Sequence, residues 1–278
     1  MKTFDLRCQL GYTLQQQTPA VFNIQPVENN VQKIVGEDLY IKPSLSPEEY
    51  RGLFEQNRYL RVNPPEGDFE ISYSATVEVS YFWGDPNSIR ETPPAELPAD
   101  TLHYLYPSRY CQSDLLFGLA MSEFGELVPD YSRVTAICNW IYDKVQYVSG
   151  SSDSQTSAYD TATQRTGVCR DFAHLAIAFC RALNIPARFV SAYAYKLQPP
   201  DFHACFEAYL GDRWYLFDAT RLVPLDGIIR ISTGRDAADV SFATFFGAAQ
   251  LDRMNLSVDL VSESEENDFG GEGAIAIN

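Results

Sequence analysis

The clearest pattern in the chain is a strict alternation of apolar and polar positions in residues 70–81, EISYSATVEVSY. Every second position from Ile71 to Tyr81 is apolar, and polar residues lie between them. Because successive side chains of a strand point to opposite faces, this alternation predicts a strand with one buried and one solvated face. Shorter strands are predicted in TFDLRCQLGY, AVFNIQP, DLYIKP and YLRVN. We therefore expect residues 1–83 to form an antiparallel sheet or a small sandwich.

Two short segments interrupt this β pattern. Residues 46–57, SPEEYRGLFEQN, predict one or two helical turns with Ser46 as the N-cap. Residues 84–100 are rich in proline, which breaks helices and cannot donate to a β ladder. We therefore predict an N-terminal β domain over 1–83 and a proline-rich linker over 84–100.

Helical patterns come next, and strands follow them. In residues 131–148, Val134, Ile137 and Ile141 lie on one stripe of a helix. The stretch RTGVCRDFAHLAIAFCRALNIPARF predicts another apolar helix that stops at NIP. Strands are predicted at ARFVSAYAY, HACFEAYL and WYLFDA, the last two joined by the hairpin turn GDR. Helices and strands do not alternate strictly, so we predict an α+β core over 101–261 with helices packed on an antiparallel sheet.

The C-terminal segment changes character within a few residues. Residues 254–261, MNLSVDLV, predict one further edge strand at the end of the core. Residues 262–278 are acidic and glycine-rich, which is typical of a flexible tail.

The composition limits the classes of partner that we expect for this chain. The net charge of −16 repels phosphate backbones and anionic membrane surfaces, so we expect neither nucleic acid nor a membrane as a partner. No stretch reaches the roughly 20 apolar residues of a membrane span, and polar residues interrupt any signal-peptide core at the N-terminus. The cysteines form no C-x-x-C pair, which is typical of reduced cytosolic thiols. We expect a cytoplasmic protein without a metal or a cofactor.

One cysteine lies where a helix is predicted to begin. Cys169 follows Gly167, which permits a tight turn, and precedes the apolar helical pattern. Unpaired N–H groups and the helix dipole stabilise a thiolate at such a position, so we predict that Cys169 is reactive. Cys180 lies three turns further along about the same face of the helix. No helix end stabilises a thiolate there, and we interpret Cys180 as a core residue.

A thiol nucleophile needs a base, and the base needs a group that orients it. In residues 201–221, His203 starts one strand of the predicted hairpin and Asp218 ends the next. The start of one antiparallel strand lies beside the end of its partner, so the hairpin should bring the two side chains together. The carboxylate would hold one imidazole nitrogen while the other faces the thiol. Taken singly, His203 also fits a structural histidine and Asp218 a turn cap.

The stretches GVCRDFAHLAIAFCRALNIPARFVSAY and FHACFEAYLGDRWYLFDATR resemble the transglutaminase-like superfamily of thiol enzymes. Within it they are most similar to bacterial transglutaminase-like proteins regarded as candidate cysteine proteases. The pattern is G-x-C-R-D, then H-x-W/C-x-E and, after a hairpin, F-D-P/A-T. Residues 1–83 resemble the N-terminal β domain of these enzymes, and LYPSRYCQSD and GRDAADVSF resemble further family segments. The resemblance implies a papain-like/transglutaminase-like core.

The resemblance also implies a catalytic triad. Matched position by position, Cys169 is the nucleophile, His203 the base and Asp218 the orienting carboxylate. Ala219 stands where relatives more commonly carry proline, a change that leaves the three residues intact. Other members of the same stretch are interpreted as scaffold for the site: Arg170, Asp171 and His174.

These residues predict thiol acyl transfer on an amide or peptide bond, most simply by a cysteine peptidase or amidase acting on a peptide or protein substrate. The Cys169 N–H is an expected oxyanion donor, and Tyr147 is a candidate for the second. Protein-glutamine transamidation shares the thioester intermediate and stays open. Trp140 and Trp214 could exclude water from the site as transamidation requires, but they fit a core role equally well.

Two further hypotheses need no acyl transfer. The chain could be a non-catalytic binding module that has kept the fold. A metal could also bind Cys169, His203 and Cys205, because positions 203 and 205 lie on one face of a strand.

Overall fold

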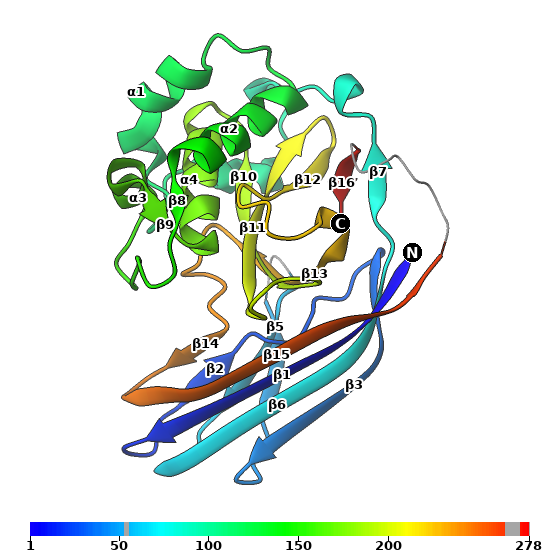
Figure 1. Cartoon of the computed structure of the whole chain (residues 1–278), viewed down its shortest axis with the longest axis vertical. Helices are drawn as coiled ribbons and strands as arrows, with labels where there is room; N and C mark the ends of the chain where they lie inside the picture. The colour runs from blue at the N-terminus through cyan, green and yellow to red at the C-terminus, as the bar shows by residue number, and fades with distance from the viewer. Residues whose placement is uncertain (53–55, 265–272, 278) are drawn as a thin grey trace.

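The computed structural model describes residues 1–52, 56–264 and 273–277 (Figure 1). The alternating stretch forms β6 (Gly67–Val79) within an antiparallel sheet of order β15-β1-β6-β3. The other strands of this N-terminal sheet are β1 (Lys2–Leu14), β3 (Gln32–Lys42) and β15 (Ala249–Glu263). The apolar positions of β6 are buried and most polar ones are partly exposed, as the alternation predicts.

A smaller sheet has the order β14-β2-β5-β4. Its strands are β2 (Ala20–Phe22), β4 (Glu48–Arg51), β5 (Arg58–Val62) and β14 (Ala243–Phe245). β4 lies inside the segment predicted as a helical turn, so that prediction is wrong for residues 48–51, and residues 53–55 lie outside the described residues. All β4 side chains are exposed, which leaves no apolar face for a helix to bury, and pairing with β5 satisfies the backbone instead.

The second part of the chain packs helices on a larger antiparallel sheet, the core sheet, of order β13-β10-β11-β12-β16-β7. The helices are α1 (Ser113–Phe124), α2 (Tyr131–Lys144), α3 (Ala158–Gln164) and α4 (Cys169–Ala182). The strands are β7 (Phe82–Gly84), β10 (Ala187–Ala194), β11 (His203–Leu210), β12 (Arg213–Phe217), β13 (Ile228–Gly234) and β16 (Ala274–Ala276). This arrangement confirms the predicted α+β class.

Shorter elements connect these parts. A parallel pair, β8 (Gln146–Tyr147) and β9 (Thr166–Gly167), comes just before α4. The proline-rich segment and its continuation form 3-10 helices: η1 (Pro86–Ser88), η2 (Pro94–Glu96) and η3 (Ala99–Leu105). Another, η4 (Leu225–Gly227), precedes β13. None of the helices in the described part of the chain is long and apolar enough to cross a membrane.

The C-terminal segments depart from the predicted division into a core at 101–261 and a tail at 262–278. β15 pairs with β1 along its whole length, so residues 249–263 belong to the N-terminal sheet (Figure 1). Residues 274–276 form β16, which lies between β12 and β7 in the core sheet. Residues 265–272 and 278 lie outside the described residues. The local pattern predicts a strand at 254–261, but the unpaired edge of β1, far away in sequence, decides which sheet it joins.

The core sheet is packed on both faces. On one face, Phe206 of β11 belongs to a hydrophobic cluster with α4. On the other face, Val190 and Ile229 belong to a second cluster with the buried side of β1 and β6. The Tyr193 hydroxyl donates to the Ile24 carbonyl at 2.7 Å within this second contact. The β11–β12 hairpin is therefore held between two cores, which limits its freedom to move.

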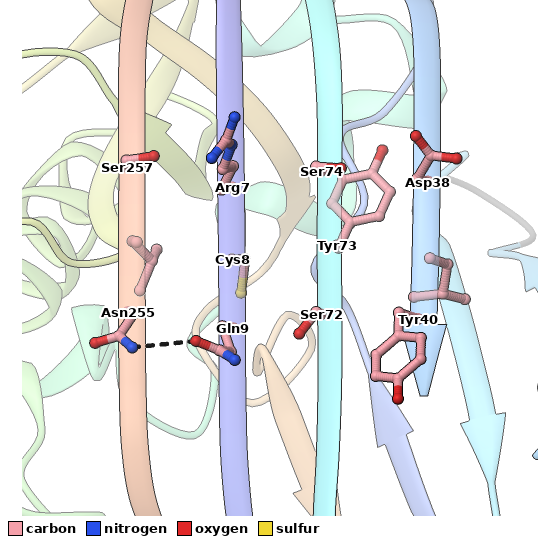
Figure 2. A pocket seen from close by; sticks show the side chains of 12 residues that line it. Arg7, Cys8, Gln9, Asp38, Tyr40, Ser72, Tyr73, Ser74, Asn255 and Ser257 are labelled. Atoms are coloured by element: carbon pink, nitrogen blue, oxygen red, sulfur yellow. Dashed lines mark hydrogen bonds between the residues drawn. The ribbon is translucent and has the colours of Figure 1, made fainter. Parts of the chain in front are cut away.

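The outer face of the N-terminal sheet carries a hollow of about 670 Å³ (Figure 2). Ser72 and Ser74 of β6 are paired in register with Gln9 and Arg7 of β1. Asn255 of β15 donates to Gln9 Oε1 at 3.2 Å. These residues are polar positions of the alternating strands, and buried positions such as Cys8 and Tyr73 also contribute to the lining. The hollow shares no lining residue with the cleft described below.

Candidate active site

Cys169 is the first residue of α4, as the sequence predicts. The Asp171 carboxylate accepts a hydrogen bond from the Val168 N–H at 2.8 Å, which closes the first turn. Gly167 is needed here for space, because a Cβ at that position would lie 2.7 Å from the Asp171 Cβ. The cysteine itself is only partly buried. A glycine and an aspartate thus fix the helix start that presents the thiol.

The β11–β12 hairpin places the next two side chains. His203 begins β11, and Asp218 directly follows β12. His203 Nε2 lies 2.8 Å from Asp218 Oδ2, so the hairpin brings them together as antiparallel geometry predicts. The second oxygen, Oδ1, accepts from the Thr220 N–H at 2.8 Å and from the Thr220 hydroxyl at 2.7 Å. The carboxylate is therefore held at both oxygens, with 0% of the His203 side chain and 3% of the Asp218 side chain exposed.

The remaining nitrogen of His203, Nδ1, is buried and forms no hydrogen bond of full geometry with the described residues. Cys169 is nevertheless close enough to act on this imidazole. Burial alone lowers the pKa of His203, but the Asp218 hydrogen bond and the adjacent Cys169 thiol outweigh burial and raise that pKa to about 10. The ring is therefore cationic at neutral pH, a state that stabilises a neighbouring thiolate. Cys169, His203 and Asp218 form one contiguous series of side chains.

Both the sequence and the fold of this chain match known proteins. Residues 1–100 match the N-terminal domain of bacterial transglutaminases, and residues 122–219 match the transglutaminase-like superfamily. The structure of a candidate cysteine protease from Cytophaga hutchinsonii is 44% identical, with a TM-score of 0.94 over 100% of this chain and 98% of that one. This chain belongs to the transglutaminase-like superfamily. The family resemblance of the sequence is thereby confirmed, N-terminal β domain included.

Curated relatives give no further information about the reaction. An uncharacterised protein of Mycobacterium leprae is 33% identical over 117 residues, which are 39% of this chain and 42% of that protein. An uncharacterised protein of Mycobacterium tuberculosis is 27% identical over 154 residues, 51% of this chain and 48% of that protein. This chain spans less than half the length of either relative.

In this transglutaminase-like protein, Cys169 and His203 both line a cleft of about 450 Å³. Much of the lining is apolar: Phe189, Phe202, Val240 and Phe242, together with small alanines. Arg170 and Asp201 are the other charged side chains of the cleft.

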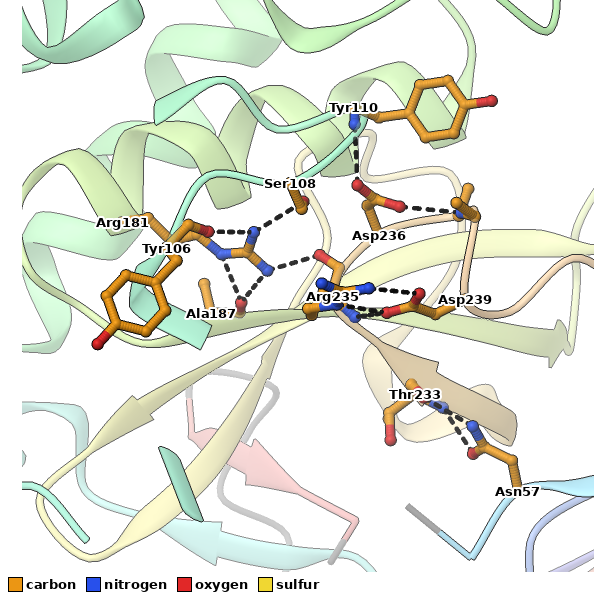
Figure 3. Close-up of polar contacts among 12 residues, drawn as sticks. Asn57, Tyr106, Ser108, Tyr110, Arg181, Ala187, Thr233, Arg235, Asp236 and Asp239 are labelled. Carbon is orange, nitrogen blue, oxygen red and sulfur yellow. Dashed lines mark hydrogen bonds and ion pairs between the residues drawn. The ribbon is translucent and has the colours of Figure 1, made fainter. Parts of the chain in front are cut away.

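A polar network holds the loop that forms one wall of the cleft, residues 235–242 (Figure 3). The Asp236 carboxylate accepts from the Tyr110 N–H at 2.8 Å. Arg181, from α4, donates to the Arg235 carbonyl at 2.5 Å. The sequence patterns did not single out Asp236 or Arg181, although the family-like segment GRDAADVSF contains the aspartate. Their role depends on contacts between α4 and a loop that follows β13, which no local pattern encodes.

The residues interpreted as scaffold lie in supporting positions. His174 Nε2 accepts from the Ala237 N–H at 3.1 Å, which ties the same wall to α4. Burial lowers the pKa of His174, and the ring stays neutral and able to accept. Arg170 donates to the Asp153 carbonyl at 2.6 Å and lies 3.2 Å from Asp171. Arg170 also lines the cleft, which a purely structural role does not require.

Tyr147 lies beside the sulfur. In β8 it pairs with Gly167 of β9, and it lies close enough to Cys169 for that residue to affect the pKa of the phenol. Burial, followed by the neighbouring Cys169, raises the pKa of Tyr147 to about 12, so the phenol stays a neutral donor. The tryptophans play no comparable part, because neither Trp140 nor Trp214 is among the described residues that line the cleft.

The other cysteines are buried and free. Burial raises the pKa of Cys8 and of Cys111 to about 12, and that of Cys180 and of Cys205 well above the usual range. Cys205 belongs to the cluster shared with the N-terminal sheet. Across residues 1–52, 56–264 and 273–277, no group of three His, Cys, Asp or Glu side chains is arranged to hold a metal, so the alternative site that included Cys205 has no support. Cys169 is the cysteine placed for chemistry.

Proposed function

We propose that this protein is a thiol acyl-transfer enzyme that hydrolyses an amide or peptide bond in a peptide or protein substrate. The observation that carries the proposal is the connected series from Asp218 through His203 to a cysteine at a helix start, open to a cleft. Asp218 fixes the ring so that Nε2 faces the carboxylate and Nδ1 is left for the thiol.

In the reaction, the Cys169 sulfur attacks the carbonyl carbon and a tetrahedral oxyanion forms. The C–N bond then breaks as the His203 imidazolium gives its proton to the departing amine, and the acyl group remains on Cys169 as a thioester. A water molecule, deprotonated by the now neutral His203, attacks the thioester, and the acid leaves as the sulfur regains its negative charge. Atoms and charge balance with one water consumed per bond cleaved.

The oxyanion needs two donors close to the sulfur. The Cys169 N–H at the helix start is one, because the first N–H groups of a helix have no internal partner. The Tyr147 hydroxyl, which neighbours Cys169, is the second.

Hydrolysis is the simpler outcome for this cleft. Transamidation shares every step up to the thioester and then requires an amine to reach it while water is kept away. The tryptophans that could have provided such a wall lie outside the described lining of the cleft. Transamidation is therefore the second candidate, and a non-catalytic binding module is the third.

The decisive experiment labels the protein with a peptidyl chloromethyl ketone and measures the intact mass. The wild-type protein should gain one label, which peptide mapping should place on Cys169. Cys169→Ala should gain none, and Cys180→Ala is the matched control that should label at the wild-type rate. A Cys169→Ala variant that still labels at the wild-type rate would exclude Cys169 as the nucleophile. Incubation of the wild type with a peptide mixture, with and without an added primary amine, then separates hydrolysis from transamidation by product mass.

A further inference from the structure

Asp201 is a carboxylate of the cleft that forms no ion pair with another described residue. It lines the cleft two residues before His203 and is exposed. Its Oδ1 accepts from the Phe202 N–H at 2.7 Å, which fixes the direction of the carboxylate. Among the described residues, no lysine or arginine forms an ion pair with Asp201. The cationic group that interacts electrostatically with its carboxylate is His203. An unpaired charge on the wall of a cleft is available to a bound molecule.

The other permanent charge of the cleft is already occupied. Arg170 donates to the Asp153 carbonyl at 2.6 Å and approaches the Asp171 carboxylate at 3.2 Å. In the described part of the chain Asp201 has no equivalent partner. Although its side chain is exposed, the neighbouring wall of the cleft removes part of its hydration, which raises the pKa of its carboxyl. A positive group of the substrate would restore that lost solvation, so the cleft favours cations on this side.

The position of Asp201 also indicates which part of the substrate it meets. In the proposed reaction His203 must lie at the nitrogen of the scissile bond, since it protonates the departing amine. Asp201 lies two residues before His203 and lines the same cleft. The carboxylate therefore lies toward the amine side of the reacting bond.

We propose that Asp201 selects substrates that carry a positive charge on the amine side of the scissile bond, such as a lysine or arginine side chain close to the departing nitrogen. This inference rests on the proposed thiol acyl transfer and names the class of substrate for it. Asp201 is a specificity-determining residue in this scheme and takes no part in breaking the bond.

The test compares two thioesters of the same shape that differ in one charge: acetylthiocholine, and 3,3-dimethylbutyl thioacetate, which has carbon in place of the ammonium nitrogen. Each transfers its acetyl group to the Cys169 sulfur as the leaving thiol takes a proton from His203. The rate of Cys169 acetylation is measured by mass spectrometry, and each rate is divided by that of the same ester with glutathione to remove intrinsic reactivity. The variants are wild type, Asp201→Asn and Asp212→Asn, where Asp212 is an exposed carboxylate at the opposite end of the same hairpin.

In the wild type, the corrected rate should be about three- to ten-fold higher for the cationic ester, a size expected for a partly solvated ion pair. Asp201→Asn should lower that ratio to about one by slowing only the cationic ester, and Asp212→Asn should keep the wild-type ratio. Raising the salt concentration to about 1 M should also lower the ratio. A wild-type ratio of one, or an equal slowing of both esters in Asp201→Asn, would overturn the inference while leaving acyl transfer intact. If neither ester acetylates the folded wild type, both proposals fall together.

Discussion

Asp218 holds two partners at once: Oδ2 lies 2.8 Å from His203 Nε2, while Oδ1 accepts from both the N–H and the hydroxyl of Thr220. The aspartate therefore combines the turn-capping role and the imidazole-orienting role that the sequence presents as alternatives. The two roles use different oxygens, so substitutions can separate them.

Asp218→Asn should lower the second-order rate of Cys169 labelling by an acyl electrophile by roughly ten- to a thousand-fold. An amide can still hold the ring in place but cannot stabilise imidazolium, and the loss should be smaller than the roughly ten-thousand-fold seen for the comparable change in serine enzymes. His203→Ala should nearly abolish labelling at neutral pH, because the thiolate loses its cationic partner.

The matched control for Asp218→Asn is Thr220→Val. This variant removes one hydrogen bond to Oδ1 and should cost about 1 kcal/mol of stability, yet label within about two-fold of the wild-type rate. Thermal melts of each variant establish that it is folded. Labelling of Asp218→Asn at the wild-type rate would reduce Asp218 to a turn residue and leave a Cys169–His203 pair.

Cys169 should react with iodoacetamide near neutral pH far faster than Cys180, by a factor on the order of 100 or more. The reason is that only the thiolate reacts, and Cys169 has the larger thiolate fraction. The pKa of Cys180 is raised well above its usual range by burial, whereas Cys169 is partly exposed beside a cationic imidazole. Brief alkylation followed by peptide mapping measures both sites in one sample. Equal labelling of the two cysteines would contradict an activated thiolate at Cys169.

The helix start at Cys169 and the pairing of His203 with Asp218 could be predicted from sequence because each has a local signal. A glycine turn before an apolar helix indicates where Cys169 lies, and a hairpin of known turn brings His203 to Asp218 without any long-range information. Binary alternation likewise predicts β6 and its buried face. In each case the residues that decide the structure are within about a strand or a helix of one another.

The parts that could not be predicted depend on partners far away in the chain. The strand pattern at 254–261 is correct, but its sheet is set by β1, and β16 joins the core sheet next to β7 for the same reason. The wall of the cleft depends on Arg181 reaching the Arg235 carbonyl from another element. Residues 48–51 form an edge strand because β5 offers a pairing edge, which outweighs a weak helical preference.

Gly167→Ala should lower the free energy of unfolding by about 1–3 kcal/mol, because the new Cβ would lie 2.7 Å from the Asp171 Cβ and force the first turn of α4 to move. It should also slow Cys169 labelling, since the helix start positions the sulfur. Gly118→Ala is the control: nothing lies within 4 Å of a Cβ there, and alanine in this helix should stabilise by up to about 1 kcal/mol. Denaturant titration of both variants measures the difference, and a neutral Gly167→Ala would show that the turn tolerates the added carbon.

Chelators should leave both the melting temperature and the Cys169 labelling rate unchanged. Some animal transglutaminases require calcium, but in the part of this chain that the structure describes no three His, Cys, Asp or Glu side chains are placed to hold a cation. Melts and labelling in EDTA, in EGTA and with added calcium measure the effect. A substantial loss of either property on chelation would reveal a metal site that these residues do not explain.

His203 should make the protein less stable as pH rises into the alkaline range. Its folded pKa of about 10 is higher than the ordinary value of 6.5, so the folded state binds an extra proton between these two values. This contribution to stability is fully present below about pH 6.5 and is lost as pH rises through about 10. Denaturant unfolding at a series of pH values should therefore show a difference between wild type and His203→Gln that shrinks as pH rises.

In the same experiment, His174 should make stability depend on pH in the opposite direction. Burial holds its folded pKa well below 6.5, so stability is lost as pH falls below 6.5, where only the unfolded state binds the proton. His174→Gln also removes the hydrogen bond from the Ala237 N–H at every pH, and its pH-dependent effect should be confined to the acidic side of the profile. If His203→Gln changes stability equally at pH 6 and pH 10, the imidazole of His203 is neutral in the folded protein. The cationic partner that the proposed mechanism gives to the Cys169 thiolate would then be absent, and attack would instead have to begin with transfer of the thiol proton to the ring.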